Sequence, residues 1–291
     1  MDYNAIRYIV ITPVRDEEAF MATILESMLA QTIRPLEWVI VNDGSSDGTA
    51  RLIDQAAEQH SWIRAVHRPN RGFRKPGGGV VDAFNDGYAA VSHSDWDFIV
   101  KLDADLTLEP NYFEQCFARF RNEPQLGLGG GTICYLVDGV KEMESTTGFH
   151  VRGATKIYRK ACWDAIGGLI SAEGWDTFDE IKANSLGWKT RSFPELHLVH
   201  HRKTGAADGH WKRLLKYGRA NYICGYHPCF LLAKCLVRIP KNPYLLGSAL
   251  IFYGFLSGYL RRLHRPDDPQ AINYLRREQM RCLLGQRSLW R

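Results

Sequence analysis

Short apolar runs alternate with longer amphipathic stretches through the first hundred residues of this 291-residue chain. The apolar runs are short enough for buried strands, which we expect at residues 8–12, 36–41, 63–67 and 98–100. The stretches between them have helical periodicity, and we expect helices at 16–30, 49–60 and 80–91. Strands that alternate with helices predict crossover units and a mainly parallel sheet, which makes the fold class α/β.

The pattern is less regular after residue 106, but four further elements can be placed. We expect a helix at 111–121, a glycine-bearing strand at 126–137, a helix at 177–186 and a strand-like segment at 190–193. Gly187 would end the helix expected at 177–186, because glycine is favoured at the position that follows a helix. The main domain is therefore predicted to extend to about residue 205.

Charged residues cluster where the predicted strands end. Arg15 and Glu17 follow the first strand, Asp43 follows the second, and Asp103 and Asp105 follow the fourth. The carboxyl ends of parallel strands meet at one edge of an open sheet, where ligands bind. Mg²⁺ in proteins takes one or two carboxylates together with phosphate oxygens. The residues are therefore suited to a divalent-cation and phosphate site, and a solvated acidic turn stays open as the alternative reading.

Three ordered segments resemble the signatures of family 2 glycosyltransferases. These are Thr12-Pro-Val-Arg-Asp-Glu-Glu18, Val41-Asn-Asp-Gly-Ser-Ser-Asp-Gly-Thr49 and Leu102-Asp-Ala-Asp-Leu106. The last segment, which is followed by Glu109-Pro110, is also similar to dolichyl-phosphate mannose synthases and their polyprenyl-phosphate relatives. The resemblance implies a GT-A fold and transfer of a sugar, with inversion, from a nucleoside diphosphate.

The resemblance also implies roles for individual residues. Thr12, Pro13, Arg15 and Glu17 of the first segment would belong to the donor site, with Pro13 and Glu17 shaping the nucleoside pocket. Asp43 would accept the N3–H of a uracil, or contact a guanine, and UDP is favoured over GDP. Asp103 would lie near the ribose and pyrophosphate, and Asp105 would ligate Mn²⁺ or Mg²⁺.

The family's catalytic base is an Asp that precedes a helix ending in Gly, and counting back from Gly187 assigns this role to Asp176. Asp179, one turn along, is the second candidate. A helix cap is the structural alternative for Asp176. Further along, His200, His201 and Arg202 could complete a metal shell or reach a pyrophosphate. In an extended segment the two histidines point to opposite faces, so only one can face the site.

Charge divides the chain unevenly. Residues 1–199 carry a net charge of −8, and residues 200–291 carry +13. The seven cysteines include no Cys-x-x-Cys pair, which argues against a zinc site or a disulfide framework and for a reducing compartment. No signal peptide is apparent. A basic C-terminal region of this kind suits an anionic membrane surface.

We therefore expect a second region, 206–291, that is helical, basic and apolar. Residues 211–223 mix cations with apolar side chains, and 244–260 is a run of 17 uncharged residues. An in-plane membrane helix is favoured for this run over a buried or dimer-forming helix and over a true span. Nucleic-acid binding is disfavoured, because the region is apolar rather than a solvated cationic face.

The sequence is thus interpreted as an inverting, metal-dependent glycosyltransferase at the cytoplasmic face of a membrane, acting on a glycan or lipid-linked acceptor. Two alternatives remain. One is a catalytically inactive nucleotide-sugar-binding scaffold of a polysaccharide assembly system. The other is a sugar-phosphate nucleotidyltransferase, which is disfavoured because residues 12–18 lack its glycine-rich signature.

Overall fold

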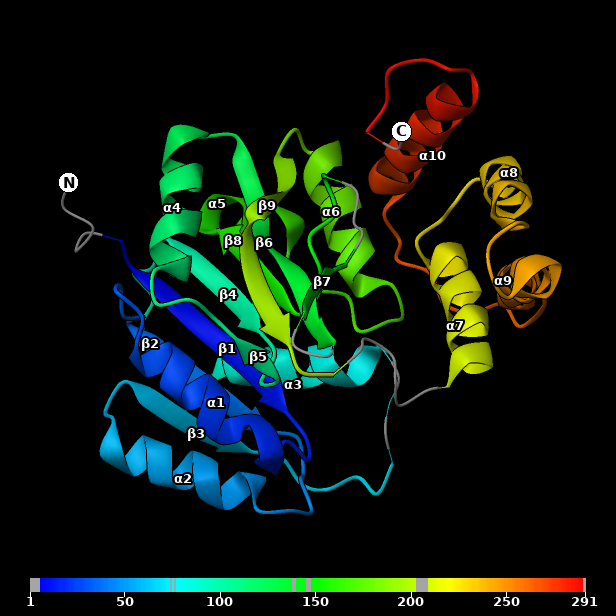
Figure 1. Cartoon of the computed structure of the whole chain (residues 1–291). Coiled ribbons are helices and arrows are strands. Elements are labelled where there is room, and N and C mark those ends of the chain that lie inside the picture. Colours follow the sequence, from blue (N-terminus) through cyan, green and yellow to red (C-terminus); the bar gives the residue numbers. More distant parts are fainter. Residues whose placement is uncertain are drawn as a thin grey trace. The chain divides into compact units, whose positions relative to one another are not determined.

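The computed structural model describes residues 6–73, 75, 77–137, 140–144, 148–202 and 209–289. Strands and helices alternate in its first part, as the apolar pattern predicts (Figure 1). These elements are β1 (Tyr8–Val14), α1 (Glu18–Leu29), β2 (Glu37–Asn42), α2 (Thr49–Gln59), β3 (Ile63–His67), α3 (Gly78–Ala89) and β4 (Phe98–Leu102).

A more mixed series follows. It comprises β5 (Leu106–Thr107), α4 (Tyr112–Asn122), β6 (Leu126–Val137), β7 (Val140–Met143), β8 (Thr155–Arg159), α5 (Lys160–Ile166), α6 (Trp175–Ser185) and β9 (Lys189–His200). The C-terminal part is helical, with α7 (His210–Ile223), α8 (Pro228–Arg238), α9 (Tyr244–Leu260) and α10 (Pro269–Leu283). The sequence analysis placed no element at β5, β7 or β8, whereas α7 to α10 lie in the region that was expected to be helical.

The described strands form one sheet in the order β3-β2-β1-β4-β8-β6-β9-β5, with β7 paired to β6. Strands β3, β2, β1 and β4 are parallel, so the predicted crossover units are present. Strand β8 then runs antiparallel to both β4 and β6, and β5 runs antiparallel to β9. The α/β class is confirmed, and the second half of the sheet is mixed.

Helices cover both faces of the sheet. On one face, Tyr8, Val10 and Trp38 belong to a fully buried cluster with residues of α1, α2 and α4. On the other face α3 packs closely, and a Cβ added to its Gly87 would lie 2.6 Å from a methyl group of Val41. These two layers fix the strands, and with them the loops at the carboxyl ends.

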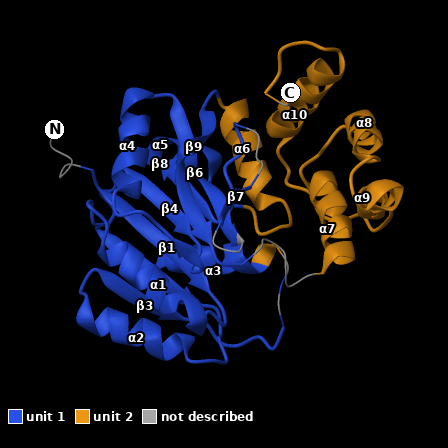
Figure 2. Cartoon of the chain, viewed as in Figure 1, with its two compact units in different colours: residues 1–75, 79–169, 187–203 blue, residues 76–78, 170–186, 204–291 orange. Residues whose placement is uncertain are grey.

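The chain divides into two compact units (Figure 2). Unit 1 comprises residues 1–75, 79–169 and 187–203, and unit 2 comprises 76–78, 170–186 and 204–291. The start of the last segment at residue 204 lies close to the boundary predicted near 205. Helix α6, which the sequence analysis assigned to the first domain, clusters with the C-terminal helices instead.

Unit 2 has a core of its own. Phe178 of α6, Tyr222 of α7, Leu231 of α8, Phe255 of α9 and Leu275 of α10 are among its buried members. Helices α7 and α9 approach each other through glycine: a Cβ on Gly218 would lie 2.1 Å from the carbonyl oxygen of Ile251. Within the described part of the chain, no helix is both long enough and apolar enough to cross a membrane.

Candidate active site

The charged residues that follow β1, β2 and β4 lie at one edge of the sheet. The register pairs Val14 with Asn42 across β1 and β2, and Ile11 with Lys101 across β1 and β4. Because these three strands are parallel, the loops that carry Glu17, Asp43 and Asp103 leave the sheet on the same side. The sequence analysis expected this convergence.

Asp105 is a well-enclosed carboxylate of this edge. Its side chain is 8% exposed, and its Oδ2 atom lies 3.1 Å from Nε2 of His200 and 2.9 Å from Nε of Arg202. Burial alone would raise the pKa of this carboxyl group, but the hydrogen bonds and charges of His200 and Arg202 outweigh it and lower the pKa to about 2. Asp105 is therefore an anion at neutral pH.

A long-range strand pairing brings His200 to Asp105. Strand β5 runs antiparallel to β9, with Leu106 opposite His200, so the side chain of the last β9 residue reaches the residue before β5. The His200 ring stacks on Tyr135 at 5.8 Å between centroids. Its Nδ1 is buried and has no hydrogen-bond partner among the described residues.

His201 lies on the other side of the chain from its neighbour. Its Nε2 is 2.8 Å from the hydroxyl oxygen of Thr107, and its ring stacks on Phe20 at 5.6 Å. Of the two histidine side chains proposed as ligands, only that of His200 contacts the Asp105 carboxylate, as expected for neighbours in an extended segment. His201 reaches Asp105 through its backbone N–H, which donates to the Asp105 carbonyl oxygen at 3.0 Å.

Arg202 connects two parts of the site. Besides Asp105, its guanidinium pairs with Oε1 of Glu17 and lies over the ring of Phe20, 5.3 Å from the centroid. Burial raises the pKa of Glu17 to about 7, although Arg202 opposes this shift; the negative charges of Asp105 and Asp103 add to it. The other carboxylate oxygen of Glu17 is buried without a partner among the described residues.

Asp103 faces a buried lysine. The Lys101 ammonium pairs with Asp103 and donates to the carbonyl oxygen of Gly153 at 2.6 Å. Burial raises the pKa of Asp103, Lys101 opposes this, and the charge of Asp105 adds to it. Asp103 is thus held beside Asp105 by a cation that sequence reasoning did not single out.

The residue expected to contact the base is already held by two arginines. Asp43 is 8% exposed, pairs with Arg68, and receives a forked pair of bonds from Arg71, 2.6 Å to each oxygen. Arg15 donates to the carbonyl oxygen of Asp43 at 3.1 Å. Sequence reasoning missed both Arg68 and Arg71, because they lie 25 and 28 residues away in a loop without a predicted element.

The first signature contributes two further positions. The hydroxyl of Thr12 is fully buried and accepts a hydrogen bond from the indole of Trp38 at 2.9 Å, so this side chain serves the packing of β1 on β2. Pro13 is half-buried next to it. The Thr12 side chain is thus engaged with Trp38, and its role in the donor site stays a prediction.

The two base candidates lie in the first turns of α6, in unit 2. Asp176 is half-buried, whereas Asp179 is 3% exposed and its Oδ1 accepts the backbone N–H of Glu180 at 2.7 Å. Both carboxylates lie near the Cys224 thiol of the same unit. The pKa of this thiol is raised chiefly by burial, and the negative charges of Asp176 and Asp179 raise it further. Asp176 is the more accessible of the pair.

The possible metal-ligating side chains of unit 1 fit a divalent cation only if the cation also takes ligands from outside this unit, such as a bound phosphate. Within the described part of the chain, no group of three or more His, Cys, Asp or Glu side chains is arranged to hold a metal by itself. Asp105 and His200 nevertheless offer an ionised oxygen and an imidazole nitrogen 3.1 Å apart. Adjacent ligands on an octahedral ion with bonds of ~2.1 Å are separated by roughly 3 Å.

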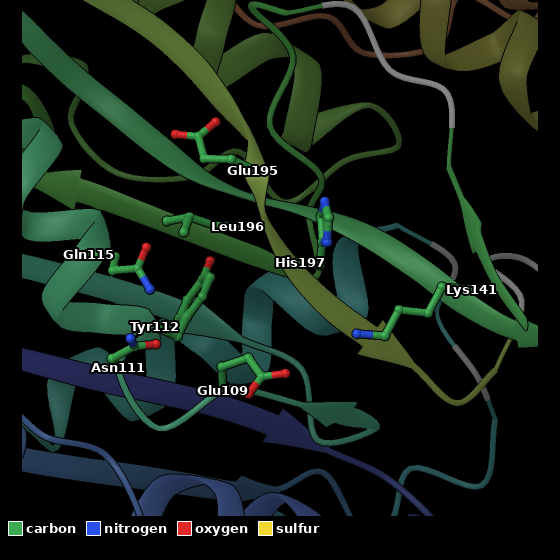
Figure 3. Close-up of a pocket in the computed structure, with 8 residues that line it drawn as sticks. All are labelled: Glu109, Asn111, Tyr112, Gln115, Lys141, Glu195, Leu196 and His197. Carbon is green, nitrogen blue, oxygen red and sulfur yellow. The ribbon is translucent and has the colours of Figure 1, made fainter.

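A small cavity lies beside α4 and β9 in the same unit (Figure 3). Its volume is about 100 Å³. None of the residues predicted for the donor, metal or base roles lines it; its lining residues are Glu109, Asn111, Tyr112, Gln115, Lys141, Glu195, Leu196 and His197.

Comparison with solved structures supports the fold. Mannosyltransferase PcManGT from Pyrobaculum calidifontis, solved in complex with GDP-Man and Mn²⁺, aligns with a TM-score of 0.56 over 97% of this chain and 76% of its own, at 14% identity. Staphylococcus aureus TarS 1–349 in complex with UDP-GlcNAc aligns with a TM-score of 0.57 over 93% and 80%, at 16% identity. Both show that the fold is GT-A.

Sequence comparison gives the family. The poly-β-1,6-N-acetyl-D-glucosamine synthase of Staphylococcus aureus (strain COL) is 25% identical over 184 residues, 57% of this chain and 41% of its own. The chain spans less than half the length of the curated relatives it matches. The sequence model named Glycosyl transferase family 2 matches residues 9–172, more than half of the chain. The chain therefore belongs to glycosyl transferase family 2.

Proposed function

We propose that the protein is an inverting, metal-dependent glycosyltransferase that moves a sugar from a nucleoside diphosphate to a hydroxyl or phosphate of an acceptor. The observation that carries this proposal is the cluster of Asp105, His200, Arg202 and Glu17 at the carboxyl edge of the sheet. In the reaction the bond between the anomeric carbon and the β-phosphate oxygen breaks. The acceptor oxygen forms the new bond from the opposite face and gives up its proton.

Asp105 and His200 would hold the cation, Mn²⁺ or Mg²⁺. When bound there, it would supply positive charge to the leaving diphosphate. Asp105 suits this role because its pKa of about 2 keeps it ionised. Arg202 would serve the same diphosphate, since guanidinium groups bind phosphate through paired hydrogen bonds.

Asp43 and Arg71 would recognise the base. The forked contact holds an acceptor and a donor side by side, which matches the N3–H and the neighbouring carbonyl of uracil. UDP-sugars are therefore favoured over GDP-sugars as donors. The two solved relatives carry one nucleotide of each kind, so the choice of base rests on the residues of this chain.

Asp176 would be the base that removes the proton from the acceptor, with Asp179 as the second candidate. A general base must reach the nucleophile within hydrogen-bond distance. The half-buried side chain of Asp176 suits this role better than that of Asp179, which is 3% exposed and bound to the backbone N–H of Glu180.

The C-terminal helices would hold the enzyme at the cytoplasmic face of an anionic membrane. On α9, the exposed side chains of Leu245, Tyr253, Leu256 and Leu260 recur at helical spacing. Gly254 and Gly258 of α9 face α7, so this apolar stripe lies on the side of α9 that points away from α7. Exposed cations flank both ends, with Lys241 before the helix and Arg261 and Arg262 after it.

A polysaccharide or polyprenyl-linked acceptor would meet the enzyme at this membrane surface. The similarity of residues 102–110 to polyprenyl-phosphate sugar synthases, which suggests the second kind of acceptor, stays a prediction. The inactive scaffold is the second candidate. It would bind a nucleotide-sugar without turnover.

The test of transfer is hydrolysis of a panel of UDP- and GDP-sugars with Mn²⁺. We expect slow, metal-dependent cleavage of one donor, lost in Asp105→Ala and retained in the surface control Asp164→Asn. Asp176→Asn should still bind that donor but fail to transfer its sugar once an acceptor is supplied. Donor binding without cleavage under every condition would favour the scaffold, and no binding would remove the proposal.

The test of membrane attachment is co-sedimentation with vesicles of phosphatidylglycerol and phosphatidylcholine. The double variant Leu245→Glu/Leu260→Glu should release the protein, because it puts two carboxylates in the apolar stripe. Leu29→Glu on α1, whose leucine is 46% exposed in unit 1, is the matched control. Wild-type protein that stays in the supernatant at low salt would contradict the attachment.

A further inference from the structure

The cavity beside α4 and β9 is lined by polar side chains whose hydrogen-bonding groups are unused (Figure 3). Asn111 and Gln115 lie at the start of α4, and Glu109 lies just before it. Lys141 comes from β7. Within the part of the chain that the structure describes, the side chains of these residues make no hydrogen bond or ion pair. The cavity therefore offers a carboxylate, two amides and an ammonium group to a ligand.

Two more polar side chains of the lining are held in place from behind. Nε of Arg119 donates to Oε1 of Glu195 at 2.6 Å. Nε2 of His197 lies 2.8 Å from the carbonyl oxygen of Pro194. Because a carbonyl oxygen only accepts, Nε2 carries the proton and Nδ1 of the neutral ring is left as an acceptor. Both side chains thus keep an acceptor atom for a ligand.

The charges around the cavity balance. The carboxylates of Glu109 and Glu195 are matched by the ammonium group of Lys141 and by Arg119. A phosphate would meet two carboxylates here, and an organic cation would meet an ammonium group. Among the described residues, no group of three or more His, Cys, Asp or Glu side chains could hold a metal ion. The lining therefore favours an uncharged polar ligand.

The size of the cavity restricts this ligand further. Its volume of about 100 Å³ is well below the roughly 300–1,000 Å³ of pockets that enclose a drug-sized molecule. Leu196 and Tyr112 supply apolar surface to the lining and are 6% and 1% exposed. A small ring with one apolar face and several hydroxyl groups matches both the volume and the lining.

We propose that this cavity binds one uncharged sugar unit of a glycan. Each hydroxyl group both donates and accepts hydrogen bonds, so one sugar unit can use the carboxylate, the amides and the ammonium group together. The C–H groups of its ring would pack on Leu196.

The cavity lies close to the candidate active site without being part of it. His197 lines the cavity and His200 contacts Asp105, and both belong to β9. Three residues of a strand span about 10 Å. The inference goes beyond the proposed function, because sugar binding in the cavity needs neither a metal ion nor a nucleotide. If the proposed function holds, the cavity would retain a glycan near the site of transfer.

The test measures binding to the full chain by isothermal titration calorimetry, without metal ion or nucleotide. The neutral probes are maltotetraose and tetrasaccharides of N-acetylglucosamine with β-1,4 and β-1,6 linkages. The charged probe is tetragalacturonate, whose units carry carboxylates. We expect at least one neutral tetrasaccharide to bind, and tetragalacturonate to bind more weakly than it does.

Substitutions in the lining assign the binding to the cavity. Gln115→Ala and Lys141→Ala should each weaken it about two- to tenfold, the usual effect of one lost hydrogen bond. The double variant should weaken it about fourfold or more. Gln115 is half-exposed and Lys141 is exposed, so neither change should unfold the protein. Gln125→Ala removes an exposed glutamine of the same unit outside the cavity, and should leave the affinity unchanged.

The outcomes separate this inference from the proposed function. It is overturned if no neutral tetrasaccharide binds to the wild type, if the double variant binds as tightly as the wild type, or if tetragalacturonate binds more tightly than every neutral probe. The hydrolysis of nucleotide-sugars is measured independently. Sugar binding that the double variant loses, in a protein that neither binds nor cleaves any donor, would refute the proposed function and leave this inference standing.

Discussion

Glu17 should make the stability of unit 1 depend on pH in an unusual direction. Its folded-state pKa of about 7 lies above the ordinary value of 4.5, chiefly because the carboxyl group is buried. The folded protein therefore keeps this proton while the unfolded chain has already released it. The stabilisation is fully present below pH 4.5 and is lost as the pH rises through 7.

The size of the effect follows from the two pKa values. A shift of one unit corresponds to about 1.4 kcal/mol, so raising the pH from 5 to 8.5 should cost the wild type about 2.5 kcal/mol through this one group. The Glu17 side chain is 12% exposed, so solvent screens it little. Glu17→Gln cannot ionise and should not show this loss.

The assay is urea unfolding of the wild type and Glu17→Gln at several pH values between 5 and 8.5. The free energy of unfolding of the variant, minus that of the wild type, should rise by about 2.5 kcal/mol across this range. Glu58→Gln, which changes an exposed carboxylate on α2, is the control and should give a constant difference. A difference for Glu17→Gln that stays constant with pH would refute the reasoning.

Three further substitutions test contacts within single units. Lys101→Met should cost about 1–3 kcal/mol of unfolding free energy in urea titrations at pH 7, because it removes the buried cation that pairs with the partly exposed Asp103. Arg71→Gln should weaken UDP binding, measured by calorimetry, about tenfold, because Asp43 loses its forked partner. Gly254→Val should cost unit 2 about 1–3 kcal/mol in thermal unfolding, because its Cβ would meet a carbonyl oxygen of α7 at 2.3 Å.

Each of these has its own check. Adding Asp103→Asn to Lys101→Met should recover part of the lost stability, and no recovery would mean that the pair is not the cause. Arg51→Gln, on the exposed face of α2, should leave UDP affinity unchanged. Ala249→Val adds the same branched side chain at an exposed position of α9 and should cost much less than Gly254→Val.

The apolar pattern predicted the parallel half of the sheet well. Strand β3 and helix α9 have the predicted bounds, and β2 differs by one residue at each end. These elements depend on local signals, which are burial on both faces, helical periodicity and glycine at the ends. Strand β8 was missed because its residues, Thr155–Arg159, include two cations that the surrounding structure buries or half-buries.

The residues of the candidate site also divide into those that the sequence could place and those that it could not. Glu17, Asp43, Asp103 and Asp105 could be placed from the sequence, because parallel strands bring their carboxyl ends to one edge. The arginines at Asp43 could not, since nothing local in residues 68–71 indicates which carboxylate they contact. Their partner is fixed by the path of a loop in which Gly72 takes a left-handed conformation, with φ of 73°.

The pairing of β5 with β9 has the largest consequence for the chemistry. It is only two residues long in β5, yet it brings His200 and Arg202 to the carboxylate of Asp105 across 95 and 97 positions of sequence. Parallel strands alone would provide an acidic edge. The antiparallel return adds an imidazole and a guanidinium to the same oxygen, so the residues that we propose for the cation and the diphosphate meet only because the second half of the sheet is mixed.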